Sequence, residues 1–217
     1  MITAVVPMKP LKEAKRRLSG VFDDPARQQL ATLMLGEVLA CLVKAPDIDK
    51  VLVLSADESI REIAAVHGCS FLREPSPRGL DCAIALAADI LARNGARSML
   101  FMPGDVPLVS TGEIAAVAQV ADAAAVVLVP SHDREGTNAM LMSPPGVISP
   151  AFGAGSFERH VSAAKVAGSA VAVVESPGLS FDIDTAADLP RLAAARSGDS
   201  RYDFVSDCLK SLAGEAV

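Results

Sequence analysis

Two carboxylates lie one residue apart near the end of the sequence, in the stretch "SFDIDT" at residues 180–185. Side chains two residues apart in an extended segment point the same way, so Asp182 and Asp184 should share one side of the chain. Like charges held that close repel each other, and each disfavours ionisation of the other. A cation between them would relieve the repulsion, so this spacing predicts a cation site.

A third carboxylate, Asp105, follows a separate apolar run in the stretch "PGDVPL". An aspartate at the end of a strand is often only a turn residue, so Asp105 alone indicates little. Together with Asp182 and Asp184 it forms a set of hard oxygen ligands from two strand ends. Mg²⁺ prefers such ligands together with substrate phosphates. We therefore expect these three aspartates to hold one or two Mg²⁺ ions.

Five basic side chains gather in the loop that follows the first apolar run: Lys9, Lys12, Lys15, Arg16 and Arg17. A cationic loop suits phosphate oxygens, although a lysine-rich loop can also be an ordinary solvated surface. The sequence contains neither the G-x-x-x-x-G-K-[ST] phosphate loop nor the G-x-G-x-x-G dinucleotide motif. Any phosphate site must therefore be of another type.

A second candidate anion site lies in "FGAGSFERH", residues 152–160. Gly153, Gly155 and Ser156 come directly before a predicted helix, where free backbone N–H groups and a hydroxyl suit a phosphate or a carboxylate. The same residues are also typical of a glycine turn followed by a serine N-cap. A basic loop, a carboxylate cluster and a separate anion site together indicate nucleotidyl transfer. In that reaction an acceptor phosphate attacks a nucleoside triphosphate, and no protein nucleophile is needed.

The elements that must position these residues alternate between apolar runs and helical patterns. This alternation predicts a doubly wound α/β fold with a mostly parallel, Rossmann-like sheet, whose ligands bind beyond the carboxyl ends of the strands. Strands are expected at 2–7, 50–56, 69–74, 98–105, 124–131 and 170–176, with a further strand possible at 139–144 and a short extended segment at 180–184. Helices are expected at 23–45, 57–68, 78–95, 111–122, 155–168, 184–198 and 203–214.

Several details of these helices are also predicted. Asp24 is the candidate N-cap of the first long helix, with Pro25 at its first position, and Asp57 caps the next. Pro190 is expected to break or bend the helix at 184–198. The chain is interpreted as one domain, 1–217, with a helical extension at 198–217. The last helix has an apolar face that would pack on its own core or on a second copy in a homodimer, formed by Phe204, Val205, Cys208, Leu209 and Leu212.

Composition excludes several classes of function. The 217 residues carry a net charge of −6, no Trp and one Tyr, which argues against a nucleic-acid stacking surface. The four cysteines have no C-x-x-C spacing, so we expect reduced, mostly buried thiols in a cytoplasmic protein. The most apolar helical stretch, 31–45, is interrupted by Glu37 and Lys44, so no membrane span is predicted.

Six stretches, taken in order, resemble the CofC/FbiD family of guanylyltransferases of coenzyme F420 biosynthesis, which are related to MobA-like nucleotidyltransferases. They are "VPMKPLKEAKRRL", "GLDCAIALA", "PGDVPLV", "PSHDREGTNAM", "FGAGSFERH" and "FDIDTAADL", spanning about residues 4–189. The resemblance implies transfer of GMP from GTP to 2-phospho-L-lactate, phosphoenolpyruvate or 3-phospho-D-glycerate. It also implies that the product passes to the enzyme that transfers its phospho-acid part to the deazaflavin Fo.

The resemblance also implies roles for individual residues. The metal-binding aspartates of the family fall on Asp105, Asp182 and Asp184. The acceptor's phosphate and carboxylate would meet Thr137, Gly153 and Ser156. The remaining assignments place Lys9, Lys15 and Arg17 at the triphosphate, with Lys15, Arg17 and Asp105 as the catalytic set, and Glu74, Pro75, Gly79, Leu80 and Asp81 near the base and ribose.

Two departures from the family pattern bear on the acceptor. Asp81 stands where many relatives have Asn, and Arg134-Glu135 stands where relatives often have glycines. Asp81 could alter ribose contacts or shift the acceptor pocket, and with both departures the sequence does not choose among the three acceptors. Two alternatives stay open: a related enzyme with another base or acceptor, and a nucleotide-binding module without catalysis. The opening "VPMKP" argues against the first, because MobA-like enzymes usually begin with a glycine-rich L-A-G-G loop.

Overall fold

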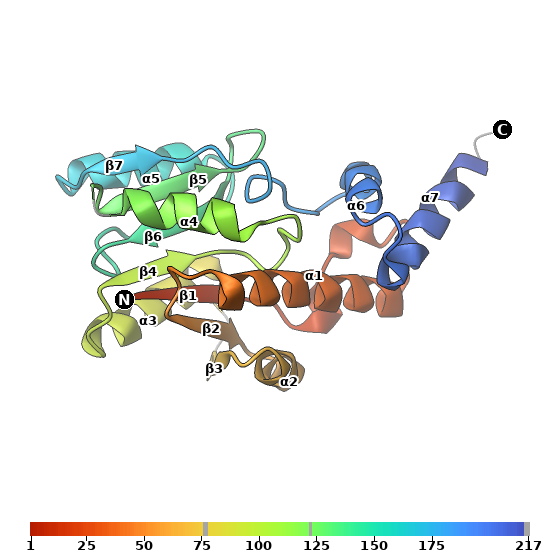
Figure 1. The fold of residues 1–217 in the computed structure, drawn as a ribbon, viewed down its shortest axis with the longest axis horizontal. Helices are drawn as coiled ribbons and strands as arrows, with labels where there is room; N and C mark the ends of the chain where they lie inside the picture. Colours follow the sequence, from red (N-terminus) through yellow and green to blue (C-terminus); the bar gives the residue numbers. More distant parts are fainter. Residues whose placement is uncertain (76–77, 122, 215–217) are drawn as a thin grey trace.

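A single seven-stranded sheet forms the centre of the molecule in the computed structural model, which describes residues 1–75, 78–121 and 123–214 (Figure 1). The strand order is β3-β2-β1-β4-β6-β5-β7. Strand β6 runs antiparallel to β4 and β5, and the other neighbours are parallel. The strands are β1 (Ile2–Pro7), β2 (Lys50–Ser55), β3 (Ser70–Arg73), β4 (Ser98–Phe101), β5 (Val126–Pro130), β6 (Thr137–Met142) and β7 (Val171–Val173). The predicted mostly parallel α/β sheet is confirmed.

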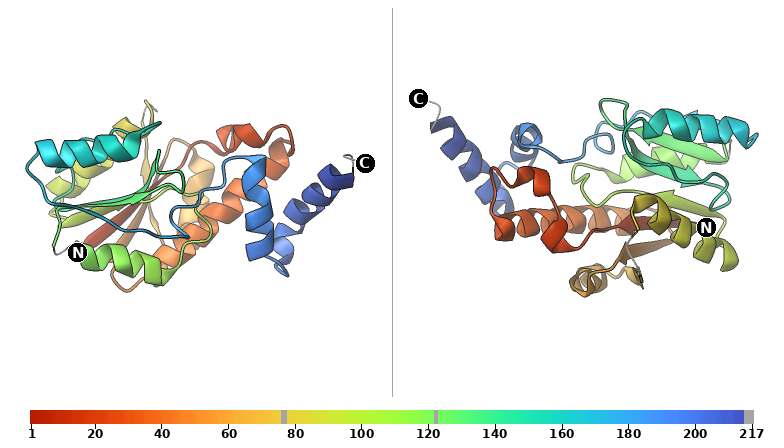
Figure 2. Two further views of the ribbon diagram at one scale, coloured as in Figure 1. Left: turned by 90° about the horizontal axis from the view of Figure 1, so that it is seen from above. Right: turned by 180° about the vertical axis from the view of Figure 1, so that it is seen from behind.

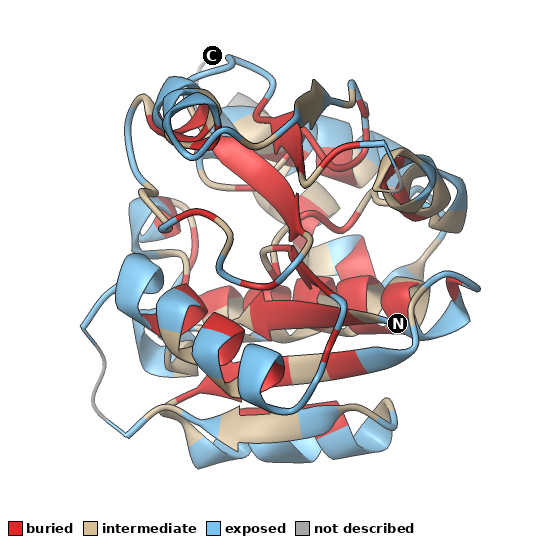
Figure 3. Cartoon of the chain, turned by 90° about the vertical axis from the view of Figure 1, so that its left-hand side faces the viewer, coloured by how far each residue is buried: buried red, intermediate tan, exposed pale blue. Residues whose placement is uncertain are grey.

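Helices cover both faces of the sheet, as expected for strands that are continuous apolar runs (Figure 2). One face packs against α1 (Asp24–Lys44), α2 (Glu58–Val66) and α4 (Thr111–Val120). The other packs against α3 (Leu80–Arg93) and α5 (Ser156–Val166). Figure 3 shows the buried strands between helices whose outer faces are exposed. The sheet is therefore buried on both faces, and the loops at its edges remain to form a site.

A third apolar cluster lies beyond the sheet, where the first half of α1 meets the C-terminal helices α6 (Leu189–Ala195) and α7 (Asp203–Gly214). Tyr202 and Val205 are buried in this cluster, and α7 extends away from the sheet (Figure 1). The apolar face of α7 thus packs within the chain over its first turns, while Leu212 is 40% exposed. The last three residues of the expected extension, 215–217, lie outside the described residues.

Some local predictions are confirmed and others are wrong. The N-cap of α1 is Asp23, whose side chain accepts from the amide of Ala26, so Pro25 is the second helical residue. Segment 180–184, predicted to be extended, forms no strand of the described sheet: Ser180 ends a turn, and 181–184 have no regular secondary structure. The four cysteines are free, as expected, but three are half-buried and Cys82 is exposed. Pro190 does interrupt its segment: a 3₁₀ turn (Ala186–Asp188) precedes α6.

The parallel pairing of β1 with β4 brings two predicted site loops to the same edge of the sheet. The basic loop follows β1 and contains two short 3₁₀ turns, η1 (Leu11–Glu13) and η2 (Arg16–Leu18). The loop with Asp105 follows β4. The backbone carbonyl of Asp105 accepts from the amide of Ile183 at 3.1 Å. This backbone hydrogen bond holds the segment that contains Asp182 and Asp184 against the loop that contains Asp105. Within the described residues, no helix is long and apolar enough to cross a membrane.

Candidate active site

A cavity of about 840 Å³ opens at the carboxyl ends of β1, β2 and β4. Its walls come from the basic loop, the start of α3, the loop after β4 and the loop before α5. Ten of the predicted site residues line it: Lys9, Lys15, Arg17, Glu74, Gly79, Leu80, Asp81, Asp105, Gly153 and Asp184. Four others do not: Pro75, Thr137, Ser156 and Asp182. The structure thus brings together most of the predicted site residues, although Lys9 and Asp184 are more than 170 positions apart in the sequence.

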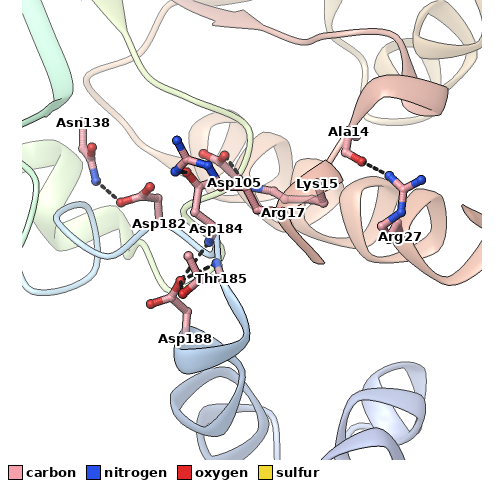
Figure 4. A network of polar contacts seen from close by, with 10 residues as sticks. All are labelled: Ala14, Lys15, Arg17, Arg27, Asp105, Asn138, Asp182, Asp184, Thr185 and Asp188. Carbon is pink, nitrogen blue, oxygen red and sulfur yellow. Dashed lines mark hydrogen bonds and ion pairs between the residues drawn. The ribbon is translucent and has the colours of Figure 1, made fainter. Parts of the chain in front are cut away.

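The ammonium group of Lys15 lies between two of the predicted metal-binding carboxylates (Figure 4). Its Nζ donates to Asp105 Oδ2 at 2.6 Å and to Asp184 Oδ1 at 2.9 Å. Burial disfavours the charged form of Lys15, but the two carboxylates outweigh it and raise its pKa above 10.5. The lysine backbone has φ of +51°, a left-handed conformation that costs a non-glycine residue energy. Strained residues of this kind are concentrated at functional sites, so the conformation of Lys15 makes this cluster the candidate site.

Asp182 has a different environment from Asp184. Its Oδ1 accepts from Asn138 Nδ2 at 3.1 Å. Burial, followed by the charge of Asp105, raises the pKa of Asp182. Burial would also raise the pKa of Asp184, but Lys15 and then Arg17 outweigh it and lower that pKa. Among the described residues, Lys15 and Arg17 pair with Asp184, whereas Asp182 forms no ion pair.

Neighbouring residues that the sequence analysis did not single out hold this cluster in place (Figure 4). Asp188 accepts from the amides of Asp184 and Thr185 and from the Thr185 hydroxyl. The buried Arg27 donates to the carbonyl of Ala14, directly before Lys15, at 2.6 Å. The T-x-x-D spacing of a capping box could have identified Asp188. No local pattern could have identified Arg27, because its partner lies 13 residues away across a loop.

The donor chemistry of this cluster fits a hard divalent cation, because carboxylate oxygens are the ligands that Mg²⁺ prefers. Asp182, which has no ion pair among the described residues, would be available to such a cation. Among the described residues, however, no three acidic, histidine or cysteine side chains converge on one point. Lys15 holds Asp105 and Asp184, and Asp182 bonds to Asn138 instead. An ion at this position would have to compete with Lys15 for the two carboxylates.

A buried polar cluster lies behind the glycine loop that precedes α5. His160 is fully buried; its Nε2 accepts from the amide of Ala151 at 2.9 Å, so Nδ1 carries the proton and donates to Thr137 Oγ1, also at 2.9 Å. The hydroxyl of Ser156 lies 3.4 Å from Thr137 Oγ1. Thr137 and Ser156, predicted to meet the acceptor, thus lie close to each other behind the cavity wall, where they connect β6 to α5.

Burial, opposed by Asp81 and assisted by Arg159, lowers the pKa of His160 from 6.5 to about 4. The unfolded chain binds a proton on this residue below pH 6.5, whereas the folded protein holds it neutral down to about pH 4. Its contribution to stability is therefore present above pH 6.5 and is lost as the pH falls towards 4. This difference between the folded and unfolded pKa of His160 corresponds to about 3 kcal/mol.

We expect the free energy of unfolding of the wild type to fall by up to about 3 kcal/mol more than that of His160→Gln between pH 7 and pH 4. Urea unfolding of both proteins across this pH range would measure it, and parallel curves would contradict it.

The two departures from the family pattern have different environments. Asp81 Oδ1 accepts from the amide of Phe152 at 2.7 Å, so this carboxylate reaches the loop that contains Gly153. Arg134 has φ of +61°, a conformation that favours glycine, and it pairs with Glu175 away from the cavity. Of the two departures, Asp81 is the one in contact with the predicted acceptor loop.

Comparison with known proteins places these residues in a wider context. Residues 2–212 match the family described as "Guanylyl transferase CofC like". The chain is 38% identical over 202 residues to the phosphoenolpyruvate guanylyltransferase of Rubrobacter xylanophilus, covering 93% of this chain and 97% of that protein. It is 32% identical over 202 residues to the 2-phospho-L-lactate guanylyltransferase of Methanothermobacter thermautotrophicus, covering 93% and 88% respectively.

Solved structures with lower identity share the fold. A nucleotidyl transferase from the same Methanothermobacter species superposes with a TM-score of 0.69 at 19% identity, over 90% of this chain and 97% of that one. A CMP:2-keto-3-deoxy-manno-octonic acid synthetase complexed with CTP superposes with a TM-score of 0.62 at 12% identity, over 90% and 98%. The sheet and its helices are therefore those of a nucleotidyltransferase fold.

Proposed function

The chain belongs to the CofC-like guanylyltransferase family, and from this premise we propose that it transfers GMP from GTP to a three-carbon phospho-acid with release of pyrophosphate. Phosphoenolpyruvate and 2-phospho-L-lactate are the acceptors named for its relatives. Together with 3-phospho-D-glycerate they form the set of candidates for this chain. By the same resemblance, the product would pass to the Fo-transferring enzyme of coenzyme F420 synthesis.

One observation carries the proposal at the level of the site. Lys15, Asp105 and Asp184 meet at 2.6 and 2.9 Å on the wall of a cavity that is also lined by Gly153. A nucleotidyltransferase needs cationic and metal-binding groups at the triphosphate, and a separate site for the anionic acceptor. Candidates for both kinds of group lie on the wall of this one cavity. A module that only binds a nucleotide would not need a separate site for an acceptor.

In the proposed reaction, a phosphate oxygen of the acceptor attacks the α-phosphorus of GTP. A new P–O bond joins the acceptor to GMP, and the bond between the α-phosphorus and the bridging oxygen of pyrophosphate breaks. The attacking phosphate is already ionised near neutral pH, so the chain needs no general base. Lys9 and Arg17 line the cavity and supply positive charge for the triphosphate. The backbone of Gly153 would hold the acceptor in line for attack.

We propose that Asp105, Asp182 and Asp184 hold Mg²⁺ in the active enzyme. When bound, the ion would neutralise charge on the phosphate oxygens and on the departing pyrophosphate. Asp105 and Asp184 would then release Lys15, which becomes available to the triphosphate. Asn138 would keep Asp182 oriented in the cluster.

Pyrophosphate release tests the proposal directly. Purified protein with GTP and Mg²⁺ is assayed in parallel with phosphoenolpyruvate, 2-phospho-L-lactate and 3-phospho-D-glycerate, and mass spectrometry identifies the adduct. We expect release with GTP and at least one acceptor, and little with ATP or CTP. Release with another nucleotide would indicate a related nucleotidyltransferase. Folded protein that binds GTP but is silent with all three acceptors would favour another acceptor or a binding module.

Two further expectations stay predictions. The cytoplasmic location agrees with four free cysteines but needs direct localisation. A homodimer would use a surface that the described residues do not identify, and light scattering at several protein concentrations would detect it.

A further inference from the structure

The loop before α5 has an unusual distribution of hydrogen bonds. Arg159 donates to three carbonyls of this loop: those of Ala151, Phe152 and Ala154. The other two carbonyls accept from backbone amides, Gly153 from Ser156 and Gly155 from Arg159. Every carbonyl from residue 151 to residue 155 is therefore engaged within the loop and the first turns of α5.

The amides of the same loop divide into two groups. Ala151 donates to His160 and Phe152 donates to Asp81. Within the part of the chain that the structure describes, the amides of the next three residues, 153–155, have no hydrogen-bond acceptor. Gly153 and Ala154 are exposed, and Gly153 lines the cavity. Because its carbonyls are all engaged, the loop offers only donors to a ligand.

Two left-handed glycines make this arrangement possible. Gly153 has φ of +98° and Gly155 has φ of +69°. These conformations are accessible to glycine at little cost, and they turn successive peptides in ways that other residues resist. Successive free amides of this kind form a concave site for an anion. The guanidinium of Arg159, on the carbonyl side of the same peptides, adds positive charge behind them.

His160 secures the loop from the interior. It is fully buried and uses both ring nitrogens, one for the amide of Ala151 and the other for the hydroxyl of Thr137 on β6. Phe152 packs against the same imidazole, with ring centroids 4.9 Å apart. Consecutive residues of α5 thus hold the loop from two sides, Arg159 at its surface and His160 beneath it.

We infer that Arg159 and His160 are positioning residues for the acceptor: they engage the loop carbonyls and its first amide so that the amides of residues 153–155 are left to bind the acceptor's anionic group. The inference rests on the proposed function, because it assigns the acceptor to this loop. Neither side chain needs to touch the substrate. Their effect should appear as weaker acceptor binding, with GTP binding retained.

Steady-state kinetics of Arg159→Ala test this inference. Glu158→Ala is the matched control, since Glu158 is the preceding exposed residue of α5 and makes none of these contacts. We expect KM for phosphoenolpyruvate or 2-phospho-L-lactate, whichever the wild type uses, to rise about 10- to 100-fold in Arg159→Ala, because a loop displaced by an ångström costs that much. KM for GTP should change less than about twofold, and Arg159→Lys, which keeps the charge, should recover part of the loss. An equal rise in both KM values would indicate a merely structural role and overturn the inference.

A second measurement does not depend on turnover. Hydrogen exchange of the peptide containing residues 151 and 152 should be at least about tenfold faster in Arg159→Ala and in His160→Gln than in the wild type, because both amides depend on a closed loop. Unchanged exchange would overturn the inference even if the wild type proved inactive. Wild-type inactivity with all acceptors, together with faster exchange in both variants, would refute the proposed function but leave the part of Arg159 and His160 in closing the loop standing. The two failures are therefore distinguishable.

Discussion

Replacing Asp105 by asparagine is expected to reduce kcat by about 10³-fold at saturating GTP and acceptor, equivalent to about 4 kcal/mol of transition-state stabilisation. Asp105 accepts from Lys15 at 2.6 Å and contributes the charge that, after burial, raises the pKa of Asp182. Its carboxylate therefore interacts with both other parts of the cluster. Asparagine keeps the size of the side chain but lacks the charge needed to hold a divalent ion. The loss should appear in kcat, because the ion acts on charge that develops during reaction.

The control for this substitution is Asp89→Asn. Asp89 lies on α3 and pairs with Arg93 at the surface, so its replacement removes the same charge away from the cavity. Its kcat should stay within about twofold of the wild type. Thermal unfolding would verify that Asp105→Asn is folded. A folded Asp105→Asn with kcat within tenfold of the wild type would contradict the assignment of Asp105 to the metal site.

Replacing Lys15 by methionine is expected to reduce both activity and stability. The lysine side chain is only 7% exposed and bonds to two carboxylates, so the variant removes the buried counter-charge of Asp105 and one of the two cations paired with Asp184. Asp184 is 40% exposed, so the loss of stability should lie between that of a surface pair and a buried pair, about 1–3 kcal/mol. Loss of a charged donor at the triphosphate should lower kcat by about 10²- to 10³-fold.

Differential scanning calorimetry with and without Mg²⁺ measures the stability effect. Each kcal/mol should lower Tm by about 2–4 °C in a chain of this size. The deficit should be largest without Mg²⁺, because the ion would replace the missing charge. Lys12→Met is the matched control: Lys12 is an exposed residue of the same loop and is not among those that line the cavity. A Lys15→Met protein as stable and as active as Lys12→Met would contradict the role assigned to the ammonium group.

The sheet was predictable from the sequence because it depends on local signals. Apolar runs bounded by Pro, Gly and Asp identify the strands, and caps such as Asp57 identify where helices begin. The antiparallel direction of β6 was not predictable, because pairing direction depends on contacts between distant segments. The N-cap of α1 was misplaced by one residue, because Asp23 and Asp24 carry the same chemistry.

The sequence predicted which residues belong to the candidate site better than it predicted the contacts between them. Asp105, Asp184 and Gly153 were identified from their positions after strands or before a helix, and they do share one cavity. The bridge from Lys15 to two carboxylates joins residues 90 and 169 positions apart, which no spacing rule encodes. The roles of Arg159 and His160 were missed because they depend on main-chain atoms of a loop. The direction of a backbone carbonyl cannot be deduced from the type of side chain that its residue carries.

The hydrogen bonding of residues 151–155 has a consequence for how acceptor preference can change. The three unengaged amides belong to the main chain, so substitution of the exposed Ala154 leaves every one of them in place. Natural variation at Ala154, to residues other than proline, would then leave intact the amides that bind the anionic group shared by all three candidate acceptors. Preference among the acceptors would instead be free to shift through neighbours such as Asp81, which contacts the loop from α3. Mutations could thus change acceptor preference without changing affinity for the shared anionic group. The affinity would depend on the backbone, and the preference on a small set of surrounding side chains.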